Sequence, residues 1–275
     1  MFDRLVFVEG QSDEDILREW ASKLGINFSK ANVGFIPMGG VRNFAHFATE
    51  ATLSFLVKRQ VKMWFILDRD EKEDSEVANL QNRLGQNAIL KVLKKREIEN
   101  YLVCPRAIKN FIKVKLSSLT ELDCKFPEES EIFENIQECA EQLKNFSINK
   151  RVAKILCKPI YPSAEQLINN SHSEAVKERV AEEIQRLITQ LEESHHQIET
   201  VYQETFTSVE SDWAIKKLDI VPGDLLLDMV CKKYDTRFKK ERDGSRLAAL
   251  MNESEIDNEV CEIIHEIGDV AESIT

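Results

Sequence analysis

The stretch LVFVEGQSDEDIL, residues 5–17, decides the fold of the first third of the chain. Four apolar residues run directly into Glu9 and Gly10, and Ser12 is followed by three acidic residues. A buried strand that ends in carboxylates is unusual, because a charge next to an apolar core is costly unless something positive meets it. A metal ion would supply that positive charge.

The same strand-to-helix pattern recurs over the first hundred residues. Strands are predicted at the segments RLVFVEG, NVGFIPMGG, VKMWFILDRD and AILKVLKK, and helices at residues 12–24, 41–59 and 75–85. Alternation of this kind predicts a parallel sheet flanked by helices, and ligands of such sheets lie at the carboxyl ends of the strands. Glu9, the Gly39–Gly40 turn, Asp68 and Asp70 all fall at those ends.

The remainder of the chain has a helical pattern. We expect helices at 105–116, 129–146 and 148–156, a break at 158–163, a long helix at 174–205, and C-terminal helices within 221–234 and 244–267. This pattern predicts three regions: a catalytic α/β core at 1–110, a mostly helical domain at 111–205, and C-terminal helices at 206–275 that pack back on the core.

The long helix carries apolar residues at alternating spacings of four and three. They are Val180, Ile184, Leu187, Leu191, Ser194, Ile198 and Val201, with one serine in the series. Such spacing fits a helix packed in a local bundle, and it also fits a coiled-coil arm that forms a homodimer. The sequence leaves both interpretations open.

Composition restricts the class of protein. The 275 residues carry a formal charge of −11, and the six cysteines are scattered without a C-x-x-C pair, which argues against a zinc site and favours the reducing cytoplasm. No apolar run approaches the length of a membrane helix, and no signal peptide is recognisable. The negative charge disfavours a general nucleic-acid binder, although carboxylates loaded with divalent metal would present positive charge to a phosphate.

Each acidic motif has an ordinary explanation when it is taken alone. Glu9 could be incidental, and the helix dipole accounts for Asp13. The segment ILDRD resembles a Walker B strand or a glycosyltransferase D-x-D, but the chain has no P-loop motif and therefore no expected ATP site. REIENYL, residues 96–102, could be a plain salt-bridged segment.

Taken in order, the motifs V-E-G-x-S-D, G-G, L-D-R-D and R-E-I-E-N-Y resemble the Toprim domain, and in particular that of the OLD (overcoming lysogenization defect) family of nucleases. The resemblance is strong over residues 4–104. It assigns Glu9 as the Toprim glutamate and Asp68 and Asp70 as the D-x-D pair. It adds Asp13 and Glu99, with Glu97 as the alternative to Glu99, as further metal ligands.

The resemblance implies a nuclease that hydrolyses DNA phosphodiester bonds with two Mg²⁺ or Mn²⁺ ions, in phage defence or DNA repair. Two such ions stabilise both the attacking and the leaving oxygen. Glu9 would also handle a proton, and Gly10, Gly39 and Gly40 would let the backbone approach a phosphate. The candidate phosphate contacts are the basic stretches at 91–96, with Lys94, Lys95 and Arg96, and at 231–242.

The chain departs from the family pattern in two ways. OLD proteins generally carry an N-terminal ABC-type ATPase ahead of the Toprim region, and this sequence has none. We therefore expect either a stand-alone Toprim protein that is partnered with a separate ATPase, or the nuclease half of a longer protein. The family's P-G-K lysine is replaced by Asp224, and Lys216 or Lys217 could substitute for it. The alternatives are a degenerate module that binds nucleic acid or an ATPase, and a Toprim nuclease that processes RNA.

Overall fold

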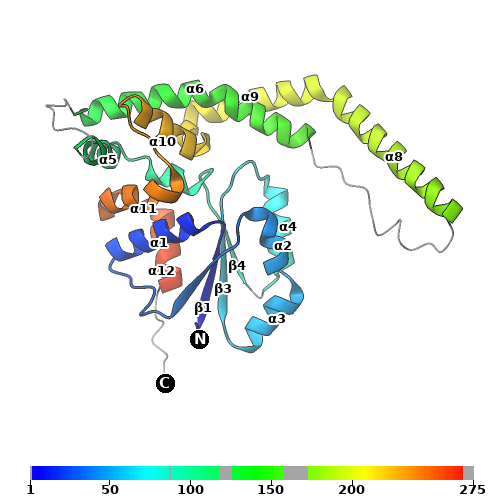
Figure 1. The fold of residues 1–275 in the computed structure, drawn as a ribbon, viewed down its shortest axis with the longest axis horizontal. Coiled ribbons are helices and arrows are strands. Elements are labelled where there is room, and N and C mark those ends of the chain that lie inside the picture. Colours follow the sequence, from blue (N-terminus) through cyan, green and yellow to red (C-terminus); the bar gives the residue numbers. More distant parts are fainter. Residues whose placement is uncertain (1, 87, 118–125, 158–172, 269–275) are drawn as a thin grey trace. The chain divides into compact units, whose positions relative to one another are not determined.

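The computed structural model describes residues 2–86, 88–117, 126–157 and 173–268, which belong to two compact units (Figure 1). The first unit is formed by residues 1–143 and 217–275, and the second by residues 144–216. The second unit therefore starts and ends later than the helical domain that the sequence predicts at 111–205. Each unit is described by itself.

The first unit is built on four parallel strands in the order β2-β1-β3-β4. The strands are β1 (Arg4–Val8), β2 (Val33–Pro37), β3 (Lys62–Leu67) and β4 (Ile89–Val92). All three neighbouring pairs are parallel, with Phe7 opposite both Ile36 and Phe65. The predicted α/β class with a parallel sheet is thus confirmed, and the carboxyl ends of the strands lie along one edge.

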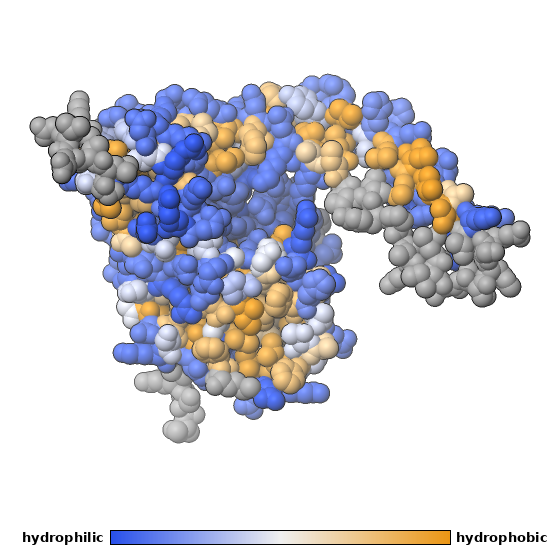
Figure 2. All heavy atoms as spheres, viewed as in Figure 1, coloured by the Kyte–Doolittle hydropathy of each residue, from blue (hydrophilic) through white to orange (hydrophobic). Residues whose placement is uncertain are grey.

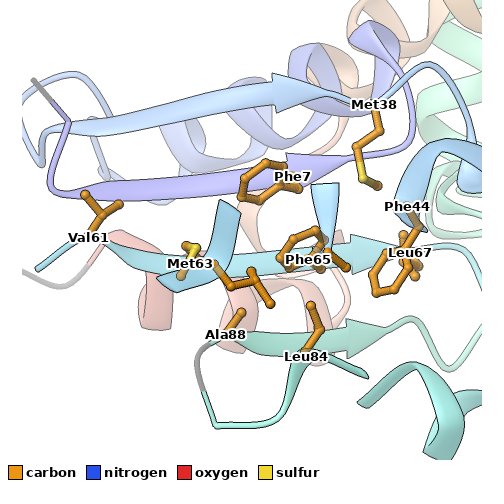
Figure 3. Close-up of a cluster of buried hydrophobic side chains, with 11 residues drawn as sticks. Phe7, Met38, Phe44, Val61, Met63, Phe65, Leu67, Leu84 and Ala88 are labelled. Atoms are coloured by element: carbon orange, nitrogen blue, oxygen red, sulfur yellow. The ribbon is translucent and has the colours of Figure 1, made fainter. Parts of the chain in front are cut away.

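Three helices cover one face of this sheet: α2 (Phe44–Phe47), α3 (Glu50–Lys58) and α4 (Asp74–Leu84). Between them and the strands lies a cluster of buried apolar side chains, shown in Figure 3. Phe7 stacks on Phe65 with ring centroids 4.3 Å apart, and Phe44 meets Phe65 edge-on. Burial of these aromatic rings holds β1 and β3 together as the centre of the sheet.

The other face is covered by helices from both ends of the chain, namely α1 (Gln11–Lys23), α11 (Lys240–Leu250) and α12 (Asn258–Gly268) (Figure 1). Ile16 and Trp20 of α1 are fully buried, and the indole nitrogen of Trp64 donates to Glu266 of α12 at 2.9 Å. Gly244 allows α11 to approach α1 closely, because a Cβ there would lie 2.9 Å from Ile16 Cδ1. This contact brings the start of α11 near the start of α1.

Several helix predictions were wrong in their boundaries. The helix predicted at 41–59 is interrupted, and its parts are η1 (Val41–Asn43), α2 and α3, because the Thr49 side chain accepts from the Thr52 amide and starts α3 anew. Phe55 of α3 is 55% exposed. The two helices predicted at 129–146 and 148–156 form a single helix, α6 (Glu129–Leu156). The break predicted at 158–163 lies outside the described residues.

The second unit contains α8 (Ser173–His196) and much of α9 (Ile198–Ile220), so the helix predicted at 174–205 is interrupted at Gln197. Several heptad side chains are exposed, among them Val180, Ile184 and Leu191. Figure 2 shows the hydrophobic residues gathered along α8. This exposure does not decide between the local bundle and the coiled coil, and the homodimer stays a prediction.

The remaining elements of the first unit connect the sheet to its C-terminal helices. They are η2 (Ile98–Leu102), α5 (Pro105–Ser117), α10 (Gly223–Lys232) and η3 (Glu253–Glu255). Within the described part of the chain, none of the helices is long and apolar enough to cross a membrane. The five described cysteines are free thiols.

Candidate metal centre

The ends of β1 and β3 are joined directly through the first two predicted ligands. The backbone amide of Asp68 donates to Glu9 Oε1 at 3.1 Å, and the amide of Ile98 donates to Asp68 Oδ1 at 2.9 Å. These two bonds connect three segments that are far apart in the sequence: the strand ends at Glu9 and Asp68, and the ENY segment at η2. The parallel sheet thus brings the motifs together at its carboxyl edge.

A lysine from the last quarter of the chain lies among these carboxylates. Lys240 Nζ is 2.7 Å from Glu99 Oε1 and 2.9 Å from Asp13 Oδ1. It is also 4.0 Å from Asp68 Oδ2. Lys240 was not predicted as a catalytic residue, although it belongs to the basic stretch at 231–242 that was considered for phosphate contacts.

A second lysine, Lys72, lies on the other side of the site. Lys72 Nζ donates to Asp70 Oδ2 at 3.1 Å and to the Asp68 carbonyl at 2.8 Å, and it lies 4.0 Å from Glu9 Oε1. Asp70 adopts a positive φ of 47°, which turns the chain after β3. The sequence analysis missed Lys72. Its position two residues after the D-x-D pair was the signal that could have identified it.

The two lysines divide the acidic residues into two groups. One ammonium group faces Asp13, Asp68 and Glu99, and the other faces Glu9 and Asp70. We call these five residues the carboxylate cluster. Burial raises the pKa of Glu9 despite Lys72, raises that of Asp68 well above its usual range, and raises that of Glu99 to about 7. Burial alone would lower the pKa of Lys240, but the three carboxylates outweigh it and raise that pKa.

The two glutamates of REIENYL have different environments. Glu97 Oε1 accepts from Arg96 Nε at 3.0 Å, and its Oε2 accepts from the Gly223 amide at 2.9 Å, at the N-terminus of α10. Glu99 is 1% exposed, and its Oε2 has no hydrogen-bond partner among the described residues. Glu99 therefore joins the carboxylate cluster, whereas Glu97 caps a helix.

The three predicted glycines border the cluster. The Gly40 amide donates to the Glu9 carbonyl at 2.8 Å, and the Gly10 amide donates to Asp13 Oδ2 at 2.8 Å. Gly39 and Gly40 have φ values of 74° and 106°, which L side chains rarely adopt. The turn after β2 thus depends on glycine, and it places backbone groups beside the end of β1.

Two of the three basic residues at 94–96 form ion pairs within the protein. Arg96 is buried and pairs with Glu71 and Glu97, and Lys95 Nζ lies 3.0 Å from Asp257 Oδ2. Lys94 is the exposed member of the three. Arg96 holds η2 in place through Glu97 and has no exposed surface to offer a phosphate.

The structure also places the lysines that were expected to replace the family's P-G-K lysine. Lys216 lies 3.0 Å from Asp212, and Lys217 lies 2.8 Å from Glu141, so neither of these ion pairs involves a residue of the carboxylate cluster. Asp224 is exposed in the first turn of α10, where Glu97 accepts from the amides of Gly223 and Asp224. The Asp224 carboxylate itself accepts from the Leu225 amide at 2.6 Å. The lysines that do reach the cluster are Lys240 and Lys72.

Comparison with known families agrees with this arrangement. Residues 2–70 match the family described as overcoming lysogenization defect protein-like, TOPRIM domain. The predicted resemblance is confirmed over this segment, which holds Glu9, Asp13, Asp68 and Asp70. No curated protein and no solved structure matches the chain.

The TOPRIM match indicates a nuclease-type or primase-like function in nucleic-acid metabolism and a domain that binds divalent metal. The donor set fits such an ion, since Mg²⁺ and Mn²⁺ prefer carboxylate oxygens. The unpaired Oε2 of buried Glu99 and the convergence of three carboxylates on one ammonium group show that the site attracts positive charge. As the side chains stand, no three acidic, histidine or cysteine residues of the described segments are arranged to ligate a single ion. The carboxylate oxygens that would ligate an ion are paired instead with the ammonium groups of Lys240 and Lys72.

Proposed function

We propose that the protein is a divalent-metal-dependent nuclease that nicks or cuts DNA, acting in phage defence or DNA repair, with a separate ABC-type ATPase as a partner. The observation that carries the proposal is the convergence of Asp13, Asp68 and Glu99 on Lys240 at the carboxyl edge of the sheet. The TOPRIM match over residues 2–70 supports it.

The carboxylate cluster would hold the metal. Glu9, Asp13, Asp68, Asp70 and Glu99 offer enough oxygens for two ions. When bound, Mg²⁺ or Mn²⁺ activates water and stabilises the charge on the attacking and leaving oxygens. Burial raises the pKa of Glu9 above its usual value, which favours a role for this carboxylate in proton transfer.

The two lysines supply the positive charge that the replaced P-G-K lysine would have supplied. A phosphodiester gains negative charge on the way to its transition state, and a fixed ammonium group next to it lowers the barrier. Lys240 is held at the centre of the cluster by α11, and its raised pKa keeps it charged. Lys72 is positioned to play the same part beside Glu9 and Asp70.

A degenerate module without catalytic function is the less favoured candidate. Its supporting feature was Asp224 in place of the family lysine. That support weakens, because Lys240 reaches the carboxylates from another element.

The test is incubation of pure protein with supercoiled plasmid in Mg²⁺, Mn²⁺ or EDTA, with an RNA substrate in parallel. We expect nicking or linearisation with metal and none in EDTA. Asp13→Asn and Asp68→Asn should each reduce the rate at least about 100-fold, since loss of one electrostatic contact to the transition state costs that much in other enzymes.

Asp15→Asn is the matched control. Asp15 lies on the same helix as Asp13, but its carboxylate accepts from Gln11 at 3.1 Å and does not join the cluster. This variant should cut at the wild-type rate. Equal cutting by wild type and Asp68→Asn would mean that the activity belongs to another site, and cutting of RNA alone would favour the RNA-processing alternative.

A further inference from the structure

The segment from Cys231 to Arg246 carries an unusual charge for this chain. It contains seven Lys or Arg residues and three Asp or Glu residues, whereas the whole chain has a net charge of −11. This segment includes the end of α10, the connection to α11 and the first two turns of α11. Positive charge is therefore concentrated next to the carboxylate cluster.

Packing of the apolar residues turns these cations outward. Gly244 and Leu247 are buried, Gly244 against Ile16 of α1, and Phe238 packs edge-on against Phe111 of α5 with ring centroids 6.2 Å apart. The side chains of Arg237, Arg242 and Arg246 are 65%, 52% and 66% exposed, and Lys239 is also exposed. We call these four residues the α11 basic surface.

The ion pairs of this surface do not cancel its charge. Arg242 pairs with Asp243 at 2.8 Å, and Arg246 lies 3.9 Å from the same carboxylate, which is fully buried and also pairs with Lys115. Three cations thus share one anion. Arg237 lies 3.3 Å from Asp228, which also pairs with Lys232.

The α11 basic surface is continuous with the site. Lys239 is the N-cap residue of α11, and Lys240 is the first residue of that helix. Lys240 points to Asp13 and Glu99, while its neighbour Lys239 is exposed. An anionic chain that reaches the carboxylate cluster along α11 would therefore pass the exposed cations of this surface.

We propose that the α11 basic surface binds the phosphates of a nucleic-acid backbone and guides the strand to the carboxylate cluster. This inference rests on the proposed function and specifies its substrate path. A polyanion is repelled by a chain of net charge −11, so a local row of cations beside the site is needed to offset that repulsion. Arginine suits this role, because its planar guanidinium group pairs well with phosphate oxygens.

The test measures binding apart from cutting. Fluorescence anisotropy of a labelled DNA duplex is recorded in EDTA over a series of salt concentrations, for wild type and for Lys239→Gln/Arg246→Gln. Arg246 makes the longest ion pair of this surface, at 3.9 Å, and no ion pair of the Lys239 side chain is found among the described residues, so their loss should disturb the fold little. We expect at least tenfold weaker binding and a fall of about 2 in the slope of log affinity against log salt, since each phosphate contact contributes about 0.9.

Lys58→Gln/Lys62→Gln is the matched control, because both lysines are exposed and Lys62 begins β3 at the opposite edge of the sheet. This variant should bind the duplex like wild type. Unchanged binding in Lys239→Gln/Arg246→Gln would overturn the proposal, as would competition by poly-glutamate at the same charge concentration, which would assign the surface to an acidic protein. If the double variant binds more weakly and the wild type cuts no substrate, the binding role of this surface stands and the nuclease function is rejected.

Discussion

The ammonium nitrogen of Lys240 lies 2.7 Å from Glu99 Oε1, so the first residue of α11 reaches the segment that follows the fourth strand. Glu99 is almost fully buried, and the same ammonium group contacts Asp13 of α1. One side chain thus neutralises acidic residues from two elements. The position of Lys240 accounts for the tolerance of so many carboxylates at the edge of an apolar sheet.

Lys240→Met should lower the stability of the protein in EDTA by about 3 kcal/mol, because it leaves the buried carboxylates without their partner. Mn²⁺ should then raise the melting temperature more in this variant than in wild type, since the ion no longer competes with an ammonium group. Thermal unfolding with and without Mn²⁺ measures both effects. Lys239→Met, which changes the exposed neighbour, should behave like wild type in both measurements.

Substitution of the two glutamates of REIENYL should affect metal binding differently. Glu99→Gln should weaken Mn²⁺ binding by at least about tenfold, because it removes a charged ligand from the cluster. Glu97→Gln should leave Mn²⁺ affinity unchanged and lower the melting temperature, because Glu97 pairs with Arg96 and caps α10. Isothermal titration calorimetry and thermal unfolding of both variants check this assignment, and the reverse pattern would make Glu97 the ligand.

The sequence predicted the sheet and its acidic edge because those features are local. A strand that runs into Glu9 or Asp68 is visible in a short window, and parallel topology then brings the strand ends together. Lys240 could not be located in this way. Its contact with Asp13 depends on α11 packing against α1, which the close approach at Gly244 permits, and no periodicity in either segment encodes that pairing.

The structure also changes the expected result of the lysine substitutions. Lys216→Ala and Lys217→Ala should cut plasmid like wild type, because these lysines pair with Asp212 and Glu141. Lys240→Ala should abolish cutting, and Asp224→Lys should have little effect, since Lys240 already provides the positive charge. A gain of activity in Asp224→Lys together with normal cutting by Lys240→Ala would show that the cluster lacks its lysine.

Acid should weaken the ion pair between Arg106 of α5 and Glu255 of η3. Hydrogen bonds from Arg106 hold the pKa of Glu255 down to about 2, well below its usual 4.5. A lowered folded-state pKa stabilises the protein above the unfolded-state pKa, and this contribution is lost as the pH falls through the folded value. The melting temperature of wild type should therefore exceed that of Glu255→Gln near neutral pH, and the difference should disappear between about pH 4.5 and pH 2. A difference that is constant with pH would mean that the ion pair contributes nothing.

Two glycines that both allow close packing should differ sharply in their tolerance of alanine. A Cβ at Gly223 would lie 2.8 Å from the Asn100 backbone nitrogen and 2.9 Å from Glu99 Cβ, so the clash is with the segment that positions the cluster. A Cβ at Gly244 would meet the end of the Ile16 side chain, which can rotate away, and alanine improves helix propensity there by about 1 kcal/mol. Gly223→Ala should cost about 2 kcal/mol and weaken Mn²⁺ binding, whereas Gly244→Ala should be close to neutral in both. Urea unfolding and metal titration of the two variants test this contrast. If Gly223→Ala is as close to neutral as Gly244→Ala in both measurements, α10 can shift away from Glu99 without affecting the site.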